Sequence, residues 1–356
     1  VARGAFGKES YILTGYFNLN KVFEITLYNG TDPLTGKKIG LETGDPASFN
    51  NFEELFAAFK IQLKYFAEIK LRGNNIIEQL YARFMPVPFL SLIIDDCIEN
   101  GKDYNAGGAK YNTSYVQGVG LGSLTDNLTS LKYNVFDKKK FSMNEMMEAL
   151  KANFEGKEEL RYDLIYETPK YGNDDNYTDG QTVKIFDAFY EVINGKPTAR
   201  GGVFRINLLP TTSHVYFGSV INAMPDGRKA KEPLSEGISP VQGADRKGPT
   251  AVIKSAAKID HIKTGGSLLN QKFSPAFFND EEGINKFVSL IRSYFKMDGH
   301  HIQFNVVNAE TLKDAQKHPE KHEDLIVRVA GYSDYFNDLG EELQNEIIKR
   351  TEHEGM

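Results

Sequence analysis

Cysteine and tryptophan are the residue types that this sequence most clearly lacks. Its 356 residues include one cysteine, Cys97, and no tryptophan. A single cysteine excludes an intrachain disulfide framework and a metal site built from several cysteines. Asp95 and Asp96 stand directly before it, and their negative charge disfavours a reactive thiolate. We therefore expect an inert structural thiol, and we expect the two aspartates to cap or solvate a turn rather than to bind a cation.

Long hydrophobic runs are also missing. The longest apolar stretch is Phe84–Ile94 (FMPVPFLSLII), which contains two prolines. It is too short to cross a bilayer, so we expect no membrane partner. No signal-peptide pattern is visible, and the expected location is the cytoplasm. The chain opens with Val1 rather than methionine, from which we expect a processed or truncated chain.

Basic runs are absent as well. Lysine and arginine number 42 against 48 aspartates and glutamates, and the net charge is −6. Because nucleic-acid binding needs a concentration of positive charge, we expect no nucleic-acid partner. The length is enough for about two domains or for one large α/β domain.

What is present alternates between helix-like and strand-like patterns. Asn51–Phe84 has apolar residues at helical spacing, with Gly73 as a break between two helices. Gly201–Gly218 indicates one or two strands interrupted at Pro210. Met224–Ala251 is rich in proline, glycine and charge, which indicates a domain boundary or a long functional loop. Helix and strand patterns then alternate to the C-terminus, so the fold class is α/β.

The stretch GVGLG contains three glycines, Gly118, Gly120 and Gly122, and it can be interpreted in two ways. A glycine-rich loop can cradle a phosphate, but the spacing does not match a dinucleotide fingerprint. A close-packed turn before a helix is the commoner explanation, and we expect that one here.

The usual acid–base groups do not form a recognisable centre. His300 and His301 are adjacent on an expected strand, so their side chains point to opposite faces and cannot hold one metal ion together. His214 fits a buried core histidine better than a ligand. No serine-hydrolase, zinc-protease or P-loop pattern appears. We therefore predict no metal site, and these residues alone indicate only an α/β protein.

The segment Arg328–Phe336 (RVAGYSDYF) places a glycine among residues typical of a buried strand. Together with Arg350 and Thr351 after a terminal helix, it resembles the glycyl radical signature of the pyruvate formate-lyase-like enzymes. Glycine suits this role because its α-carbon radical can lie flat between the amide nitrogen and the carbonyl. A Cβ would hinder both planarity and hydrogen abstraction, and a tight buried loop would shield the radical. The alternative is an ordinary turn glycine.

The resemblance extends over the whole chain and implies the fold. Members of the family form a ten-stranded α/β barrel of two half-barrels, surrounded by helices, with a C-terminal glycyl radical domain. This chain would supply the second half of the barrel in residues 1–226 and the glycine radical domain in residues 234–356. Among the subfamilies it is most similar to the trans-4-hydroxy-L-proline dehydratases, in stretches such as DYNAGGAKYNTSYVQGVGLG and TGGSLLNQKFSP.

The resemblance also implies a mechanism and its partners. A radical S-adenosylmethionine activating enzyme would take a hydrogen from Gly331, so the glycyl radical is installed after translation and no cofactor is bound. The glycyl radical would oxidise a cysteine to a thiyl radical, which attacks a small-molecule substrate. Dehydration of trans-4-hydroxy-L-proline would yield 1-pyrroline-5-carboxylate under anaerobic, oxygen-sensitive conditions. The complete enzyme would be a homodimer, and this chain would need the N-terminal half of the barrel.

The first residues of this chain differ from the family pattern. The catalytic loop is expected to read Cys-Val-Glu before GAFGKES; Val1 matches its valine, Ala2 stands at the glutamate position, and the cysteine would precede Val1. By itself the chain is therefore expected to be inactive.

The same resemblance places Tyr16 in the substrate pocket, with Thr211 and Leu209 as further pocket residues. Ordinary packing is the alternative for all three. Two other functions remain open: a non-catalytic glycyl radical carrier or inactive fragment, and another glycyl radical dehydratase or C–N lyase.

Overall fold

Two parallel sheets organise the molecule. The computed structural model describes residues 7–355. Its larger sheet has four parallel strands in the order β1-β2-β3-β4, namely β1 (Glu9–Asn18), β2 (Tyr111–Val119), β3 (Val203–Leu208) and β4 (Thr264–Ser267). Parallel neighbours need long crossovers, which the intervening helices provide. The expectation of an α/β fold with parallel strands is confirmed.

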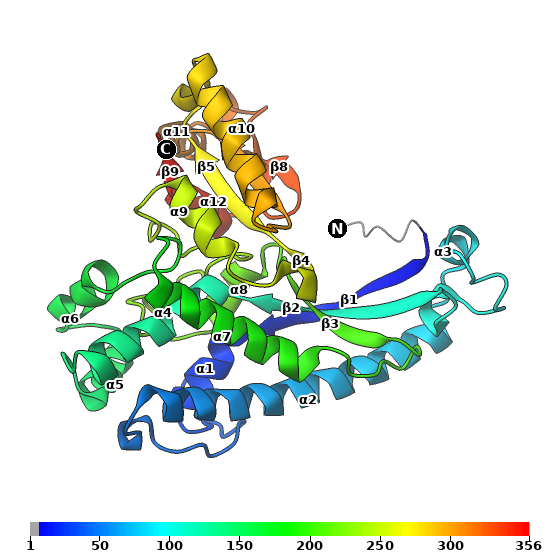
Figure 1. Ribbon diagram of the computed structural model, residues 1–356, viewed down its shortest axis with the longest axis horizontal. Helices are drawn as coiled ribbons and strands as arrows, with labels where there is room; N and C mark the ends of the chain where they lie inside the picture. Colours follow the sequence, from blue (N-terminus) through cyan, green and yellow to red (C-terminus); the bar gives the residue numbers. More distant parts are fainter. Residues whose placement is uncertain (1–6, 356) are drawn as a thin grey trace.

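Helices on one face of this sheet bury most of the core (Figure 1). They are α1 (Leu19–Leu27), α2 (Phe52–Phe84), α4 (Leu121–Leu131) and α7 (Asn176–Ile193). Phe23, Phe59, Leu128 and Phe189 of these helices and Ile206 of β3 are all buried in one apolar core. Because side chains alternate along a strand, the opposite face of β1–β3 stays available for a site.

Shorter helices fill the connections. They are α3 (Pro88–Ile93), α5 (Met143–Lys151), α6 (Glu158–Tyr162), α8 (Ser213–Ser219) and α9 (Pro249–Ala256), with π-helical turns at Lys132–Asp137 and Asp163–Glu167. Helix α8 decides between the one or two strands expected around Pro210, because β3 precedes the proline and the chain after it is helical and not a second strand. The burial of His214 and the close approach of Gly218 to the Glu232 carbonyl favour the helix, which the local sequence did not indicate.

The C-terminal part forms the second sheet, in the order β6-β5-β9 and again parallel. Its strands are β5 (Leu269–Phe273), β6 (Ile302–Val306) and β9 (Glu352–His353); its helices are α10 (Glu281–Lys296), α11 (Ala309–Lys317) and α12 (Glu341–Lys349). The antiparallel hairpin of β7 (Ile326–Arg328) and β8 (Ser333–Tyr335) stands beside them (Figure 1). The alternation of helix and strand expected up to the C-terminus is confirmed.

Two expectations about glycines can now be compared with the structure: the helix break expected at Gly73 is wrong, and the close-packed turn expected at Gly118–Gly122 is correct. Gly73 does not break the helix, because α2 runs without interruption from Phe52 to Phe84. Gly120 is the N-cap of α4 at φ +80°, and a Cβ there would lie 2.2 Å from the Asn20 side chain. Gly118 and Gly122 are also crowded, since a Cβ there would lie 2.8 Å from the Phe189 ring and 2.5 Å from the Ser239 carbonyl oxygen respectively. The glycine cluster is therefore a close-packed turn before a helix.

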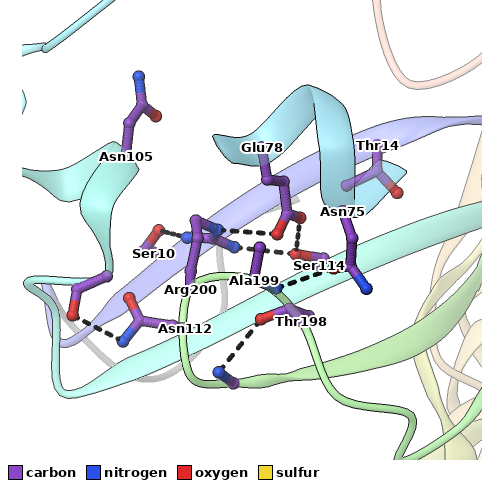
Figure 2. Close-up of polar contacts among 12 residues, drawn as sticks. Ser10, Thr14, Asn75, Glu78, Asn105, Asn112, Ser114, Thr198, Ala199 and Arg200 are labelled. Atoms are coloured by element: carbon purple, nitrogen blue, oxygen red, sulfur yellow. Dashed lines mark hydrogen bonds and ion pairs between the residues drawn. The ribbon is translucent and has the colours of Figure 1, made fainter. Parts of the chain in front are cut away.

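A buried ion pair attaches α2 to the large sheet (Figure 2). Arg200 and Glu78 lie 3.6 Å apart, and Arg200 also donates to Ser10 and, at 3.0 Å, to Ser114. Ser114 in turn donates to Glu78, so one cluster joins α2, β1 and β2 with the loop before β3. Among residues 7–355, no helix is both long and apolar enough to cross a membrane, α2 included.

Candidate active site

Gly331 lies at the tip of the β7–β8 hairpin. Its φ is +85°, a conformation that L-residues rarely adopt, and the loop closes through a 2.9 Å bond from the Val329 amide to the Tyr332 carbonyl. A Cβ on Gly331 would lie 3.1 Å from Cδ2 of Leu209. The backbone conformation and the close approach of Leu209 both favour glycine here. The tight loop is as expected, but Gly331 is exposed rather than buried in the described part of the chain.

Arg350, which directly follows α12, holds the base of this loop through hydrogen bonds to its backbone. Its guanidinium donates to the carbonyl of Val329 at 3.0 Å and to that of Arg328 at 3.4 Å. Glu346, one turn earlier on α12, accepts two bonds from Arg350, at 3.1 and 2.8 Å. Burial by itself raises the pKa of Glu346, but Arg350 and His214 outweigh it and hold that pKa below its ordinary value. A charged pair therefore holds the hairpin against α12.

A β-bulge turns Tyr16 toward the free face of the large sheet. Leu13 pairs with Tyr115 and Tyr16 with Gln117, so β1 carries one extra residue between these pairs. Without it, Tyr16 would share the helix-facing side of Thr14, whose hydroxyl accepts a bond from Asn74 of α2 at 2.8 Å. The bulge sends the Tyr16 ring to the opposite face.

Tyr16 there meets the loop that follows β3. The Tyr16 hydroxyl lies 3.1 Å from Oγ1 of Thr211. Thr211 has φ +52°, which is unusual for a β-branched residue and is typical of functional loops. Two residues earlier, Leu209 is buried, and its amide donates to Oε1 of Gln117 at 2.9 Å. The structure thus brings Tyr16, Thr211, Leu209 and Gly331 together from three separate segments, namely β1, the loop after β3 and the tip of the β7–β8 hairpin.

Comparison with protein families decides the relationship of this chain. A family model described as pyruvate formate lyase-like matches residues 1–218, and a second, described as glycine radical, matches residues 234–337. The chain belongs to the pyruvate formate lyase-like glycyl radical enzymes. The glycine radical match includes Gly331 and the hairpin that carries it.

Individual members of the family are similar over nearly the whole chain. The trans-4-hydroxy-L-proline dehydratase of Clostridioides difficile is 57% identical over 352 residues, which are 99% of this chain and 45% of that protein. Its crystal structure, with trans-4-hydroxy-L-proline bound, superposes with a TM-score of 0.97 and has the same coverage. The glycerol-bound, B12-independent glycerol dehydratase of Clostridium butyricum is 41% identical with a TM-score of 0.94, over 98% of this chain and 44% of that one. The chain spans less than half the length of these relatives.

Other residues considered from the sequence do not join the site. Cys97 is buried in the turn after α3, where burial, with help from Asp103 and Asp96, raises the pKa of its thiol, as expected of a structural cysteine. His214 is fully buried with Nε2 3.6 Å from Glu346, as expected of a core histidine. His300 and His301 directly precede β6 and are not part of it.

Two further predictions concern metals and the start of the chain. Within residues 7–355, no group of three or more histidine, cysteine, aspartate or glutamate side chains could hold a metal ion. The predictions for Val1 and Ala2 fall outside the described residues, and the domain division at residues 226 and 234 also remains a prediction.

The sequence interpretation missed a polar aromatic surface beside the Tyr16–Thr211 pair. Tyr11 and Tyr115 stack with ring centroids 4.2 Å apart, and Tyr115 donates to Glu9 at 3.1 Å. Asn207 of β3 donates to the Tyr11 hydroxyl. A Cβ on Gly265 would strike the Tyr115 ring, so β4 leaves room for this stack through its glycine. The alternation of Arg205, Ile206, Asn207 and Leu208 in β3 was the available signal.

Proposed function

We propose that this chain carries a glycyl radical at Gly331 and belongs to a dehydratase that removes water from trans-4-hydroxy-L-proline, giving 1-pyrroline-5-carboxylate. The observation that carries the proposal is the meeting of Gly331, Leu209 and the Tyr16–Thr211 pair at one place. The 57% identity to the Clostridioides difficile hydroxyproline dehydratase supports this substrate over others in the family.

The reaction would proceed by hydrogen-atom transfers. A carbon radical derived from S-adenosylmethionine, made by an activating enzyme, takes one hydrogen atom from the Gly331 α-carbon and leaves one electron there. The Gly331 radical takes a hydrogen atom from a cysteine thiol, and the resulting thiyl radical takes a hydrogen atom from the substrate. The substrate radical loses its hydroxyl with a proton as water, and the thiol then returns its hydrogen atom. Substrate and products balance as C5H9NO3 to C5H7NO2 and H2O.

The residues of the site have distinct roles in this scheme. The hydroxyls of Tyr16 and Thr211 can donate to and accept from a polar substrate, and their mutual 3.1 Å bond orients both. Leu209 lies close to Gly331 and gives the glycine an apolar neighbour. Such a site positions the substrate, while the radical carries out the bond breaking.

The proposed enzyme also includes polypeptide beyond this chain, since its relatives are more than twice as long. Large apolar side chains on α2 and α3 are strongly exposed, at 64% for Phe84, 74% for Phe89 and 66% for Leu92. An apolar patch of this kind marks a surface that another segment covers. We therefore include the first half of the barrel, and a homodimer of the complete enzyme, in the proposal.

The test uses the protein in its natural length, incubated without oxygen with its activating enzyme. We expect an organic radical by electron paramagnetic resonance, and then backbone cleavage at Gly331 on exposure to oxygen. Gly331→Ala should abolish both, and an unchanged far-ultraviolet circular dichroism spectrum would show that the strained tip has not unfolded the chain. Cleavage at residue 331 in the alanine variant would disprove the radical assignment.

Product analysis then separates the alternatives. Formation of 1-pyrroline-5-carboxylate from trans-4-hydroxy-L-proline supports the proposed substrate. Turnover of glycerol or another diol instead would identify another glycyl radical dehydratase. A radical without turnover of any substrate would favour a radical carrier, and no radical at all would favour an inactive fragment.

A further inference from the structure

Gln303 on β6 makes three contacts with the loop that carries Gly331. Its Oε1 accepts the Gly331 N–H at 3.1 Å and the Arg328 Nε–H at 2.9 Å. Its Nε2 lies 3.4 Å from the Val329 carbonyl. The side chain is 6% exposed, so little water competes for these bonds. One amide group thus contacts the hairpin at three positions around the glycine.

The chemistry of the contacts fixes the orientation of this amide. Both groups that face Oε1 are donors, and the group that faces Nε2 is an acceptor, so the reversed amide would lose all three bonds. The contact between Gln303 and Gly331 is therefore specific in its polarity and not only in its shape.

Asn305 provides a matched neighbour on the same face of β6. Its Oδ1 accepts the Arg328 amide and its Nδ2 donates to the Arg328 carbonyl, both at 2.7 Å. Residues two apart on a strand point to the same side, which is why both amides reach the hairpin. Asn305 anchors the base of the loop, whereas Gln303 alone of the two bonds to Gly331.

We propose that Gln303 is a positioning residue for Gly331, which holds the glycine N–H so that the α-carbon keeps its left-handed geometry against Leu209. The role rests on the proposed function. When one hydrogen atom leaves the α-carbon, the remaining electron is shared with the amide nitrogen and the carbonyl. An acceptor on the N–H increases the electron density that nitrogen can share, so the Gln303 bond stabilises the radical as well as the loop.

Hydrogen exchange tests the bond without any radical chemistry. In Gln303→Leu, the Gly331 amide should exchange about tenfold faster, the factor that one ordinary hydrogen bond supports. Gln303→Glu keeps an oxygen acceptor and should restore slow exchange at Gly331. Asn305→Leu is the control: it should speed exchange at the Arg328 amide and leave that of Gly331 within about twofold of the parent protein.

Electron paramagnetic resonance then tests the role in the natural-length protein, activated without oxygen and labelled with 15N-glycine. We expect Gln303→Leu to lower the nitrogen hyperfine coupling and to accumulate about tenfold less radical. Asn305→Leu should retain the parental coupling, and Gln303→Glu, which keeps an oxygen acceptor, should not fall below it. A residue that merely anchors the loop would change the amount of radical and leave the coupling unchanged.

The outcomes separate this role from the proposed function. If the parent protein forms no radical at Gly331, the proposed function fails and this role fails with it. If the parent forms the radical and Gln303→Leu matches it in coupling and exchange, only the role of Gln303 is overturned. The same holds if Asn305→Leu reproduces every effect of Gln303→Leu, because Gln303 would then be one anchor among several.

Discussion

Individual residues of this protein carry more than one physical demand. Gly331 must adopt φ +85° and must also leave room for Leu209, and either demand alone favours glycine. Arg200 and Glu78 show a second case, since each is buried and each satisfies several partners from different elements. Burying a charge is costly unless it is paired, so these residues stabilise the fold only as a group.

Glu78→Ala should therefore cost about 3–5 kcal/mol of unfolding free energy, because it leaves the Arg200 guanidinium buried without its carboxylate. Replacing both together, as Glu78→Leu with Arg200→Met, should cost clearly less. Urea denaturation of the two variants beside the parent protein measures the difference. Equal losses would mean that the ion pair is not the interaction that holds α2 against the sheet.

At the scale of elements, tertiary packing overrides local propensity: it preserves one helix despite a glycine, and it forms another helix where the residues favour a strand. Helix α2 continues through Gly73 because its buried side packs against α1 and α7, although glycine disfavours helix locally. The segment after Pro210 became α8 although its aromatic and β-branched residues indicated a strand. In β1, one bulge decides which face receives Tyr16.

Gly73→Ala should stabilise the chain by about 0.5–1 kcal/mol, since a Cβ there meets open space within α2 and removes backbone entropy from the unfolded state. Thermal or urea unfolding would show the gain. Gly118→Ala is the opposing control, because its Cβ would lie 2.8 Å from the Phe189 ring and should destabilise. A loss of stability in Gly73→Ala would indicate that α2 needs flexibility at this point.

For the molecule as a whole, buried carboxyl groups link stability to pH. Asp126 on α4 is fully buried, and this burial raises its pKa to about 7 despite the opposing charge of Lys170. Asp226 and Asp179 raise it further. A carboxyl whose folded pKa lies above its unfolded value binds more protons when folded, so its contribution to stability is lost as the pH rises.

Asp126→Asn should consequently become more stable relative to the parent protein as the pH rises from about 4 to 7, by up to about 1.4 kcal/mol per pH unit. Above pH 7 the difference should level off. Urea denaturation of both proteins at several pH values measures it, and the pH effects of groups that do not interact with Asp126 cancel in the difference. A difference that does not vary with pH would show that Lys170 keeps Asp126 ionised in the folded state.

The sequence by itself determined the α/β class and the family, because these depend on periodic patterns and on a local motif, Arg328–Phe336, and that motif is what points to Gly331 as the proposed radical position. It also named Tyr16, Thr211 and Leu209, which the structure brings together with Gly331. Their contacts could not be derived from spacing, since they join segments up to several hundred residues apart.

Only the tertiary structure decided the contacts that Gln303, Asn305 and Arg350 make around the glycine. The alternating amides of β6 are visible in the sequence, but a strand pattern does not say what its polar face contacts. The partner is a hairpin that follows some 20 residues later, and its approach depends on the packing of α12. Long-range contacts of this kind arise from the folded arrangement as a whole and not from any one segment.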